Sequence, residues 1–140
     1  MKRMHIHMFI DDLQKSINFY SNLFGSEPTK RKDDYAKWML NDPGVNFAIS
    51  SRGSKSGIDH LGIQVEKDIE LKDMRERLKK ADMQTFAEGE TVCCYAKSDK
   101  TWVEDPSGIA WETYRTMEDA EVFNNSSDSK TSDIKSGTCC

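Results

Sequence analysis

Apolar and polar residues alternate along residues 4–10, "MHIHMFI", which is typical of a β-strand. Because successive side chains of a strand point to opposite faces, Ile6 and Met8 share one face, and His5 and His7 share the other. The two histidines are therefore expected on the same face of a sheet.

The spacing of apolar residues changes directly after this strand. The stretch "DDLQKSINFYSNLFG" begins with aspartate, carries apolar residues at helical spacing and ends with glycine, so residues 11–25 are predicted to form a helix. The segments "YAKWML" (35–40) and "VNFAIS" (45–50) predict two strands on either side of the turn "NDPG". Residues 28–32, "PTKRK", are expected to add a further short strand.

The same order of elements then recurs. "IDHLGIQV" (58–65) predicts a strand and "DIELKDMRERLKKAD" (68–82) predicts an amphipathic helix. Four strand-like segments follow: "QTFAE", "VCCYAKS", "TWVED" and "IAWETY". With an offset of 55 residues, His5 coincides with His60, and "DPGVNFAIS" matches "DPSGIAWETY" at the ends of the two runs.

This repeat predicts an α+β protein in which two paired βαβββ modules, about residues 3–52 and 57–116, form a concave mixed sheet around a shared site. A pseudo-twofold axis between the modules would bring His5 and His60 together on that sheet. A lone histidine on a strand is more often a structural residue, but two at equivalent positions favour a common site.

Composition places the boundary of the domain. The 140 residues, of which 36% are hydrophobic and 31% are charged, fit one packed domain, which is expected over residues 1–123. Residues 124–140 are rich in Ser, Asp and Lys and nearly lack large apolar side chains, so they are expected to form a disordered tail. The tail ends in a vicinal pair, Cys139 and Cys140, which could capture soft metals or simply be reactive.

Net charge and hydropathy narrow the possible partners. The formal net charge of −4 and the pI near 5.4 argue against a general affinity for nucleic acid. No apolar run approaches the roughly 20 residues of a membrane span, and the N-terminus becomes polar too early for a signal peptide. We therefore expect a cytoplasmic protein without a membrane partner, whose cysteines stay reduced.

Glu112 is the carboxylate that could complete a site with the two histidines. It lies in "IAWETY", a final strand that is expected to be central and largely buried. A buried glutamate needs a partner or a metal, because desolvation of an isolated charge is costly. A half-exposed glutamate on the same strand would need neither.

Two cysteines, Cys93 and Cys94, stand side by side in "TVCCYAKSDKTW". A disulfide between them would be strained, so they are either buried thiols of the core or a pair of thiols that binds one soft ligand. In a regular strand their side chains would point to opposite faces. A ligand shared by both thiols therefore requires a bulge or a mobile loop at this point.

The two modules, with "HIHMFIDDLQKSINFYSNLFG", "DHLGIQV" and "EDPSGIAWE", resemble the vicinal oxygen chelate superfamily. That superfamily includes glyoxalase I, extradiol dioxygenases and antibiotic-resistance proteins, and the resemblance covers about residues 3–116. It implies a metal held by His5, which lies seven residues before the Asp of the D-L pair, by His60 and by Glu112.

One departure from the superfamily pattern bears on the chemistry. Glyoxalase I uses a fourth protein ligand, an acid at the end of the first module, where this chain has Ala48, or Ile49 without a gap in the alignment. Two histidines and one carboxylate with open positions resemble the facial triad of non-heme Fe(II) oxygenases. The resemblance thus implies Fe(II), with Mn, Zn and Ni as alternatives, and an oxygenase or transferase rather than an isomerase.

Within the superfamily, "KDDYAKWMLNDPGVNFAIS" and "CCYAKSDKTWVEDP" most closely resemble the organoarsenical carbon–arsenic lyases and their cadmium-induced relatives. This resemblance implies detoxification by Fe(II)- and O2-dependent cleavage of the carbon–arsenic bond of trivalent organoarsenicals, such as methylarsenite or aromatic arsenicals, to give arsenite. Cys93 and Cys94 match the substrate-binding thiols of this branch. Two alternatives stay open: a metal-dependent thiol transferase or resistance protein, and a non-enzymatic protein that sequesters Cd(II) or As(III).

Four further residues are candidates for the surroundings of the site. His7 would hydrogen-bond to a metal ligand or merely line the cavity. Lys100 would stabilise thiolates or an oxygen-derived anion, and Tyr95 and Trp102 would line an apolar pocket. The sequence leaves the oligomeric state open between a single chain that closes the site and a homodimer that exchanges modules.

Overall fold

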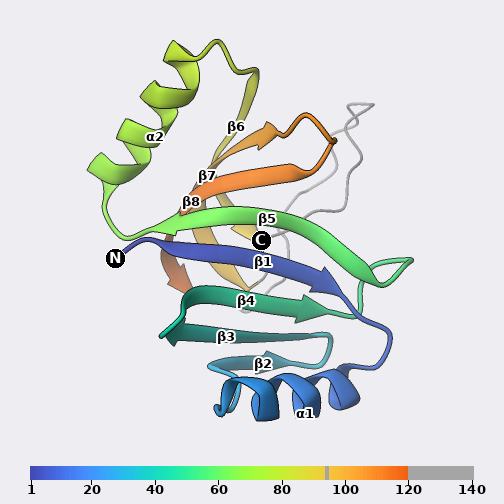
Figure 1. Ribbon diagram of the computed structural model, residues 1–140. Coiled ribbons are helices and arrows are strands. Elements are labelled where there is room, and N and C mark those ends of the chain that lie inside the picture. The colour runs from blue at the N-terminus through green and yellow to red at the C-terminus, as the bar shows by residue number, and fades with distance from the viewer. Residues whose placement is uncertain (94, 120–140) are drawn as a thin grey trace.

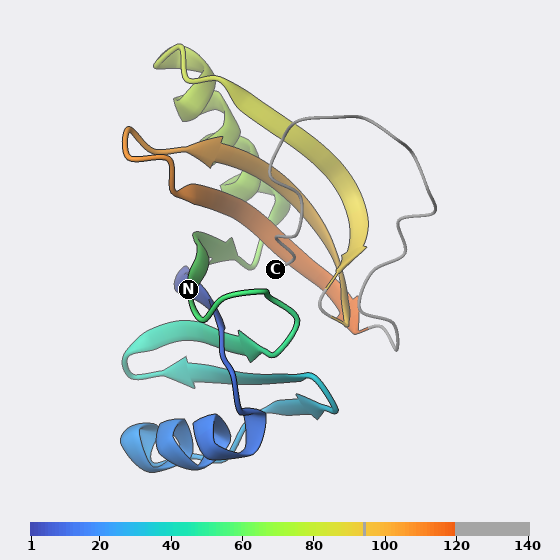
Figure 2. The ribbon, with the colours of Figure 1, turned by 90° about the vertical axis from the view of Figure 1, so that its right-hand side faces the viewer.

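The described residues, 1–93 and 95–119 of a computed structural model, form a curved mixed sheet of eight strands with two helices on its outer side (Figures 1 and 2). In chain order the elements are β1 (Arg3–Phe9), α1 (Leu13–Phe24), β2 (Lys30–Lys32), β3 (Tyr35–Asn41), β4 (Gly44–Ser50), β5 (Gly57–Val65), α2 (Asp68–Lys80), β6 (Thr85–Cys93), β7 (Ala96–Glu104) and β8 (Ala110–Asp119). Across the sheet the order is β2-β3-β4-β1-β5-β8-β7-β6, so each βαβββ module forms one half.

The two modules meet along β1 and β5, which pair antiparallel at the centre of the sheet. His5 lies opposite Gly62, and His7 lies opposite His60. With an offset of 55 residues, His5 is equivalent to His60 and His7 to Gly62, so the two pairs are equivalent to each other. A pseudo-twofold axis therefore passes between these two strands. In each module the first strand also pairs in parallel with the last, β1 with β4 and β5 with β8. The predicted α+β fold of two paired modules is therefore confirmed.

The first module is built around a large apolar core. Asp12 caps α1 by accepting a hydrogen bond from the backbone N–H of Lys15 at 3.0 Å, and Gly25 ends the helix with a left-handed φ of 65°. The apolar side of α1 packs on the outer faces of β1, β3 and β4. The buried members of this core are Ile17, Ala36, Trp38, Val45, Phe47 and Ile49.

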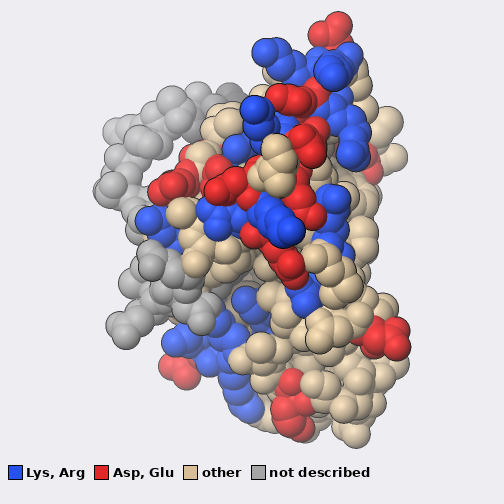
Figure 3. Space-filling view, turned by 90° about the vertical axis from the view of Figure 1, so that its left-hand side faces the viewer, with Lys and Arg blue, Asp and Glu red and all other residues tan. Residues whose placement is uncertain are grey.

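The second module has a smaller core and a more charged exterior. On α2, Leu71 and Met74 are buried against Val65 of β5. Arg75 of the same helix forms an ion pair with Asp99 of β7, with 2.6 Å between Nη2 and Oδ1. Lys and Arg side chains alternate with Asp and Glu over the upper part of the face shown in Figure 3, where α2 lies.

The strand predicted over residues 92–98 is wrong, because a hairpin turn interrupts it. β6 ends at Cys93, β7 begins at Ala96, and these two residues pair across the turn. Tyr95 adopts a φ of 60°, which takes the backbone out of the strand conformation. The regular strand therefore ends at Cys93, while the side chain of Cys93 and the whole of Cys94 lie outside the described residues.

The C-terminal predictions fall largely outside the described part of the chain. β8 continues to Asp119, whereas the predicted tail at 124–140, with Cys139 and Cys140, lies outside it. Neither helix of the described residues is long and apolar enough to cross a membrane.

Candidate metal centre

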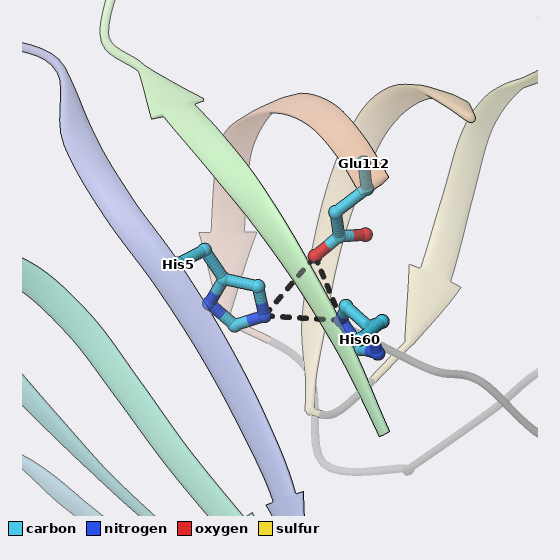
Figure 4. Close-up of side chains that lie close together, drawn as sticks. All are labelled: His5, His60 and Glu112. Atoms are coloured by element: carbon cyan, nitrogen blue, oxygen red, sulfur yellow. Dashed lines mark hydrogen bonds and ion pairs between the residues drawn. The ribbon is translucent and has the colours of Figure 1, made fainter. Parts of the chain in front are cut away.

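Three buried side chains from three neighbouring strands converge on the inner face of the sheet (Figure 4). His5 comes from β1, His60 from β5 and Glu112 from β8, and each is at most 1% exposed. The two imidazole Nε2 atoms lie 3.1 Å apart, and each lies 3.2 Å from Oε1 of Glu112. Alternation along the strands explains this convergence, because each residue lies on the inward-facing side of its strand.

The spacing of these three atoms would allow all three to bind one metal ion. With metal–ligand bonds of about 2.1 Å, ligand atoms at right angles lie about 3.0 Å apart, and those at tetrahedral angles lie about 3.4 Å apart. The observed separations of 3.1 and 3.2 Å lie between these two values, so the three atoms are close enough to bind one ion, while their spacing does not select a coordination geometry. Two imidazole nitrogens and one carboxylate oxygen are also a donor set that suits divalent iron and its neighbours in the first transition row.

The charges around the cluster keep its carboxylate ionised. Burial alone would raise the pKa of Glu112, but the Lys100 ammonium and the imidazoles of His60 and His5 outweigh burial and hold that pKa far below its usual value. Burial alone would lower the pKa of His60, but the carboxylates of Glu112 and Asp59 raise it to about 9. The carboxylates of Glu112 and Asp59 are thus held in close contact with the positive charges of Lys100 and His60.

A second layer of hydrogen bonds holds the two histidines from behind. Nδ1 of His60 lies 2.7 Å from Oδ2 of Asp59, which also lies 3.1 Å from Nδ1 of His7. Nε2 of His7 in turn lies 3.0 Å from the hydroxyl of Ser50. Nδ1 of His5 instead donates to the backbone carbonyl of Asn46 at 3.1 Å. Each ring therefore has a partner on the nitrogen that points away from the cluster.

Two residues of β7 close one side of the centre. Nζ of Lys100 lies 3.4 Å from Oε2 of Glu112 and within 6 Å of the ring centres of Trp102 and Tyr114, at 5.8 and 5.9 Å. The ring of Trp102 meets that of His60 edge-on, with 5.1 Å between ring centres. Both side chains are buried beside the His/His/Glu cluster, and the roles expected for Lys100 and Trp102 stay predictions.

Gly62 makes room for the side chain of Glu112. It lies opposite Glu112 in the parallel pairing of β5 and β8, and a Cβ at Gly62 would lie 2.7 Å from Cγ of Glu112. In the first module the equivalent pair is His7 opposite Ala48. Strand register therefore assigns Ala48, and not Ile49, to the position equivalent to Glu112, and alanine offers no ligand atom.

Tyr95 occupies a different environment from the apolar pocket wall expected for it. Its hydroxyl donates to Oδ1 of Asp34 at 2.5 Å, and its backbone carbonyl accepts from Nζ of Lys30 at 2.8 Å. These contacts tie the hairpin that follows Cys93 to the first module. The side chain of Cys93 and the whole of Cys94 lie outside the described residues, so the thiol assignment stays a prediction.

Sequence reasoning missed three residues that build the centre: Asp59, Asn46 and Gly62. Each lies next to a predicted ligand in the chain or on an adjacent strand, yet alternation alone would point Asp59 away from the site. Two surface hollows, of about 320 and 490 Å3, lie beside α2 and α1, and neither is lined by His5, His60 or Glu112.

Two βαβββ modules around an inward-facing His/His/Glu cluster define a protein of the vicinal oxygen chelate type. The chain also matches the model of the glyoxalase/bleomycin resistance protein/dioxygenase superfamily over residues 2–113. The chain therefore belongs to this superfamily.

Individual relatives refine the comparison. A trivalent organoarsenical cleaving enzyme of Bacillus sp. strain MD1 is 43% identical over 124 residues, which cover 86% of this chain and 77% of that protein. The cadmium-induced protein CadI of Mycobacterium tuberculosis is 36% identical over 142 residues, which cover 100% of this chain and 93% of that protein. An extradiol ring-cleaving dioxygenase from B. fuscum superimposes with a TM-score of 0.62 at 17% identity, covering 85% of this chain and 34% of that chain, and so shares the fold.

Proposed function

We propose that this chain is an Fe(II)- and O2-dependent enzyme that cleaves the carbon–arsenic bond of trivalent organoarsenicals and releases arsenite. The observation that carries the proposal is the buried triangle of His5, His60 and Glu112, with its sides of 3.1 to 3.2 Å. The relative named as a trivalent organoarsenical cleaving enzyme, at 43% identity over 86% of this chain, supports the substrate class.

The residues present fit a resident metal with open positions. His5 and His60 would hold it through Nε2, and Glu112 through Oε1. Bound Fe(II) supplies redox chemistry with O2 that side chains alone do not provide. Ala48 in place of a fourth acid keeps the protein ligands at three, which leaves coordination positions for O2 and the substrate.

Cys93 and Cys94 are proposed to bind the arsenic atom. Each thiol displaces one hydroxyl of R–As(OH)2 as water, so two As–S bonds form, two As–O bonds break and the carbon–arsenic bond stays intact. Two thiols thus match the two exchangeable oxygens of a trivalent organoarsenical. A pentavalent arsenical must first be reduced before two sulfurs can hold it in this way.

Lys100 and Trp102 are proposed to shape the space around the reacting atoms. The ammonium of Lys100 neutralises Glu112 across 3.4 Å and offers a fixed positive charge to an anion that develops beside it. The indole of Trp102 is buried edge-on against the ring of His60, so it would form part of the wall around a bound ligand.

The proposal is tested by loading the protein with Fe(II) under anaerobic conditions and then adding methylarsenite and air. The atoms balance with one O2 per arsenite, since CH3As(OH)2 and O2 contain the same atoms as formaldehyde and As(OH)3. Arsenite release in step with O2 consumption is expected. Cleavage under strict anaerobiosis, turnover of the pentavalent form without reductant, or binding of methylarsenite with no release of arsenite would contradict the proposal.

Variants separate capture of the substrate from the chemistry. Cys93→Ser and Cys94→Ser should each lose affinity for methylarsenite yet retain stoichiometric Fe(II). Deletion of residues 125–140 should leave turnover unchanged within about twofold, because the proposal assigns substrate binding to Cys93 and Cys94 and chain termini commonly tolerate truncation. Turnover lost with that deletion alone would move the substrate thiols to Cys139 and Cys140.

A further inference from the structure

A bulge in β5 places an acidic residue behind one of the candidate ligands. In the pairing of β1 with β5, His7 lies opposite His60, but Met8 lies opposite Ile58, so Asp59 is an extra residue without a partner. The pseudo-twofold symmetry would instead pair Asp59 with Met8. Bulges commonly redirect a side chain next to a functional site. Here the carboxylate of Asp59 turns to the inner face, where only 6% of its side chain is exposed.

The carboxylate of Asp59 receives two hydrogen bonds from imidazoles. His60 donates from Nδ1 at 2.7 Å, and His7 donates from Nδ1 at 3.1 Å. Because His7 then has a free lone pair on Nε2, the hydroxyl of Ser50 donates to it at 3.0 Å. One arrangement of protons thus satisfies all four hydrogen-bonded side chains, those of Ser50, His7, Asp59 and His60.

A metal that displaces the proton on Nε2 of His60 would then find the lone pair of that nitrogen directed toward His5 and Glu112. The other histidine has a weaker support, because Nδ1 of His5 donates to the neutral carbonyl of Asn46 at 3.1 Å. A carboxylate partner makes an imidazole more basic and fixes its ring more firmly than a carbonyl does. The two histidines are therefore unequal ligands in an otherwise symmetric pair of modules.

We propose that Asp59 is the positioning residue for His60: it holds the Nδ1 proton, fixes the ring plane and strengthens His60 as a metal ligand, with His7 and Ser50 fixing Asp59 in turn. This inference rests on the metal centre of the proposed function but not on the arsenical substrate. A competing arrangement is a second cation bound by His7, Asp59 and His60, whose ligand atoms also cluster. The hydrogen-bond distance of 2.7 Å and the shared proton pattern favour the positioning role.

The experiment measures Co(II) affinity of the full chain by competition with a chromophoric chelator. Asp59→Asn should weaken Co(II) binding about 10- to 100-fold, the range typical of lost hydrogen-bond support behind a metal ligand. Asp73→Asn, which removes the same charge from an exposed position on α2, is the matched control and should bind as the wild type does. Asp59→Glu, which keeps the carboxylate, should recover part of the affinity.

A second readout separates positioning from a merely structural role. In the Zn(II)-loaded protein, the Nδ1 proton of His60 should give a strongly downfield NMR resonance that moves upfield in Asp59→Asn. Ser50→Ala keeps the hydrogen bonds of Asp59 to His60 and His7, so it should weaken Co(II) binding less than Asp59→Asn does. Ser50→Ala replaces Asp59→Asn as the test variant if Asp59→Asn does not fold.

Each outcome has a distinct meaning. A wild type that binds no Co(II) overturns the metal centre itself. A wild type that binds one Co(II), with Asp59→Asn unchanged in affinity and spectrum, overturns the role of Asp59 alone. Two Co(II) ions per chain would overturn it in favour of a second ion.

Discussion

Replacement of Gly62 by alanine should destabilise the protein and weaken its metal binding. A Cβ at this position would lie 2.6 Å from the backbone oxygen of Glu112 and 2.7 Å from its Cγ. Carbon atoms in contact prefer about 3.5–4.0 Å, so the intruding methyl group must move Glu112 by roughly 1 Å or separate β5 from β8.

The sign of the stability change makes this a sharp test. Gly→Ala in an unstrained backbone usually stabilises a protein by about 0.4–1 kcal/mol, because alanine loses less conformational entropy on folding. Overpacking of a core costs about 1–3 kcal/mol. The net effect expected for Gly62→Ala is therefore a destabilisation of about 1–2 kcal/mol, which combines these two terms.

Gly44→Ala provides the control for this substitution. A Cβ at Gly44 would meet the flexible side chain of Met1 at 3.6 Å and the backbone oxygen of Asn41 at 3.9 Å, which are both ordinary contacts. Urea denaturation of the metal-free proteins should rank Gly44→Ala at or above the wild type and Gly62→Ala below it, and Co(II) titration should show weaker binding only for Gly62→Ala. A Gly62→Ala protein as stable as the wild type, with unchanged Co(II) affinity, would refute the steric reasoning.

Three further substitutions test other parts of the centre. Glu112→Ala should abolish stoichiometric Fe(II) binding with the fold retained by circular dichroism, and retained iron would remove Glu112 from the ligand set. Lys100→Met should destabilise the metal-free protein by about 3–5 kcal/mol in urea, because Glu112 loses a buried counter-charge. Added metal should restore part of this stability. Equal stability with and without metal would argue against the pairing of Lys100 with Glu112. Tyr95→Phe removes the hydrogen bond to Asp34 and should cost about 0.5–1.5 kcal/mol, measured in the same way, whereas an unchanged midpoint would mean that this contact does not anchor the hairpin.

The sequence pattern was sufficient to predict the fold because the same order of strands and helix occurs twice in the chain. The offset between His5 and His60 predicted the two modules, and strand register then confirmed their symmetry. Glu112 could be placed with them because a glutamate in a buried strand needs a partner. Their convergence follows from alternation along strands, while their role as metal ligands stays a proposal.

The supporting residues could not be predicted from the same pattern. Alternation assigns Asp59 to the outer face, and only the bulge opposite Met8 turns it inward. The sequence indicated an interruption at the vicinal cysteines, but not a hairpin turn at Tyr95, because "VCCYAKS" has the composition of a strand and no glycine marks the turn. Bulges and turns depend on pairing between distant strands, which local composition does not encode.

At one pair of facing positions, the larger side chain lies on the last strand of the second module but on the first strand of the first module. The second module has Gly62 opposite Glu112, and the first has His7 opposite Ala48. The space beside a glutamate does not admit even a Cβ on the facing residue, so a glutamate at Ala48 would not fit beside the imidazole of His7.

The absence of an acid at position 48 and the presence of His7 are therefore sterically linked. Ala48→Glu alone should destabilise the protein without adding a ligand, whereas His7→Gly combined with Ala48→Glu should rebuild the geometry of the second module and create a four-ligand site. Co(II) absorption spectra distinguish these cases, because a fourth protein ligand alters the d–d bands. The double variant should also lose O2-dependent turnover, since a position proposed for O2 or substrate becomes filled. A Co(II) spectrum identical to that of the wild type would show that the two modules do not share this geometry.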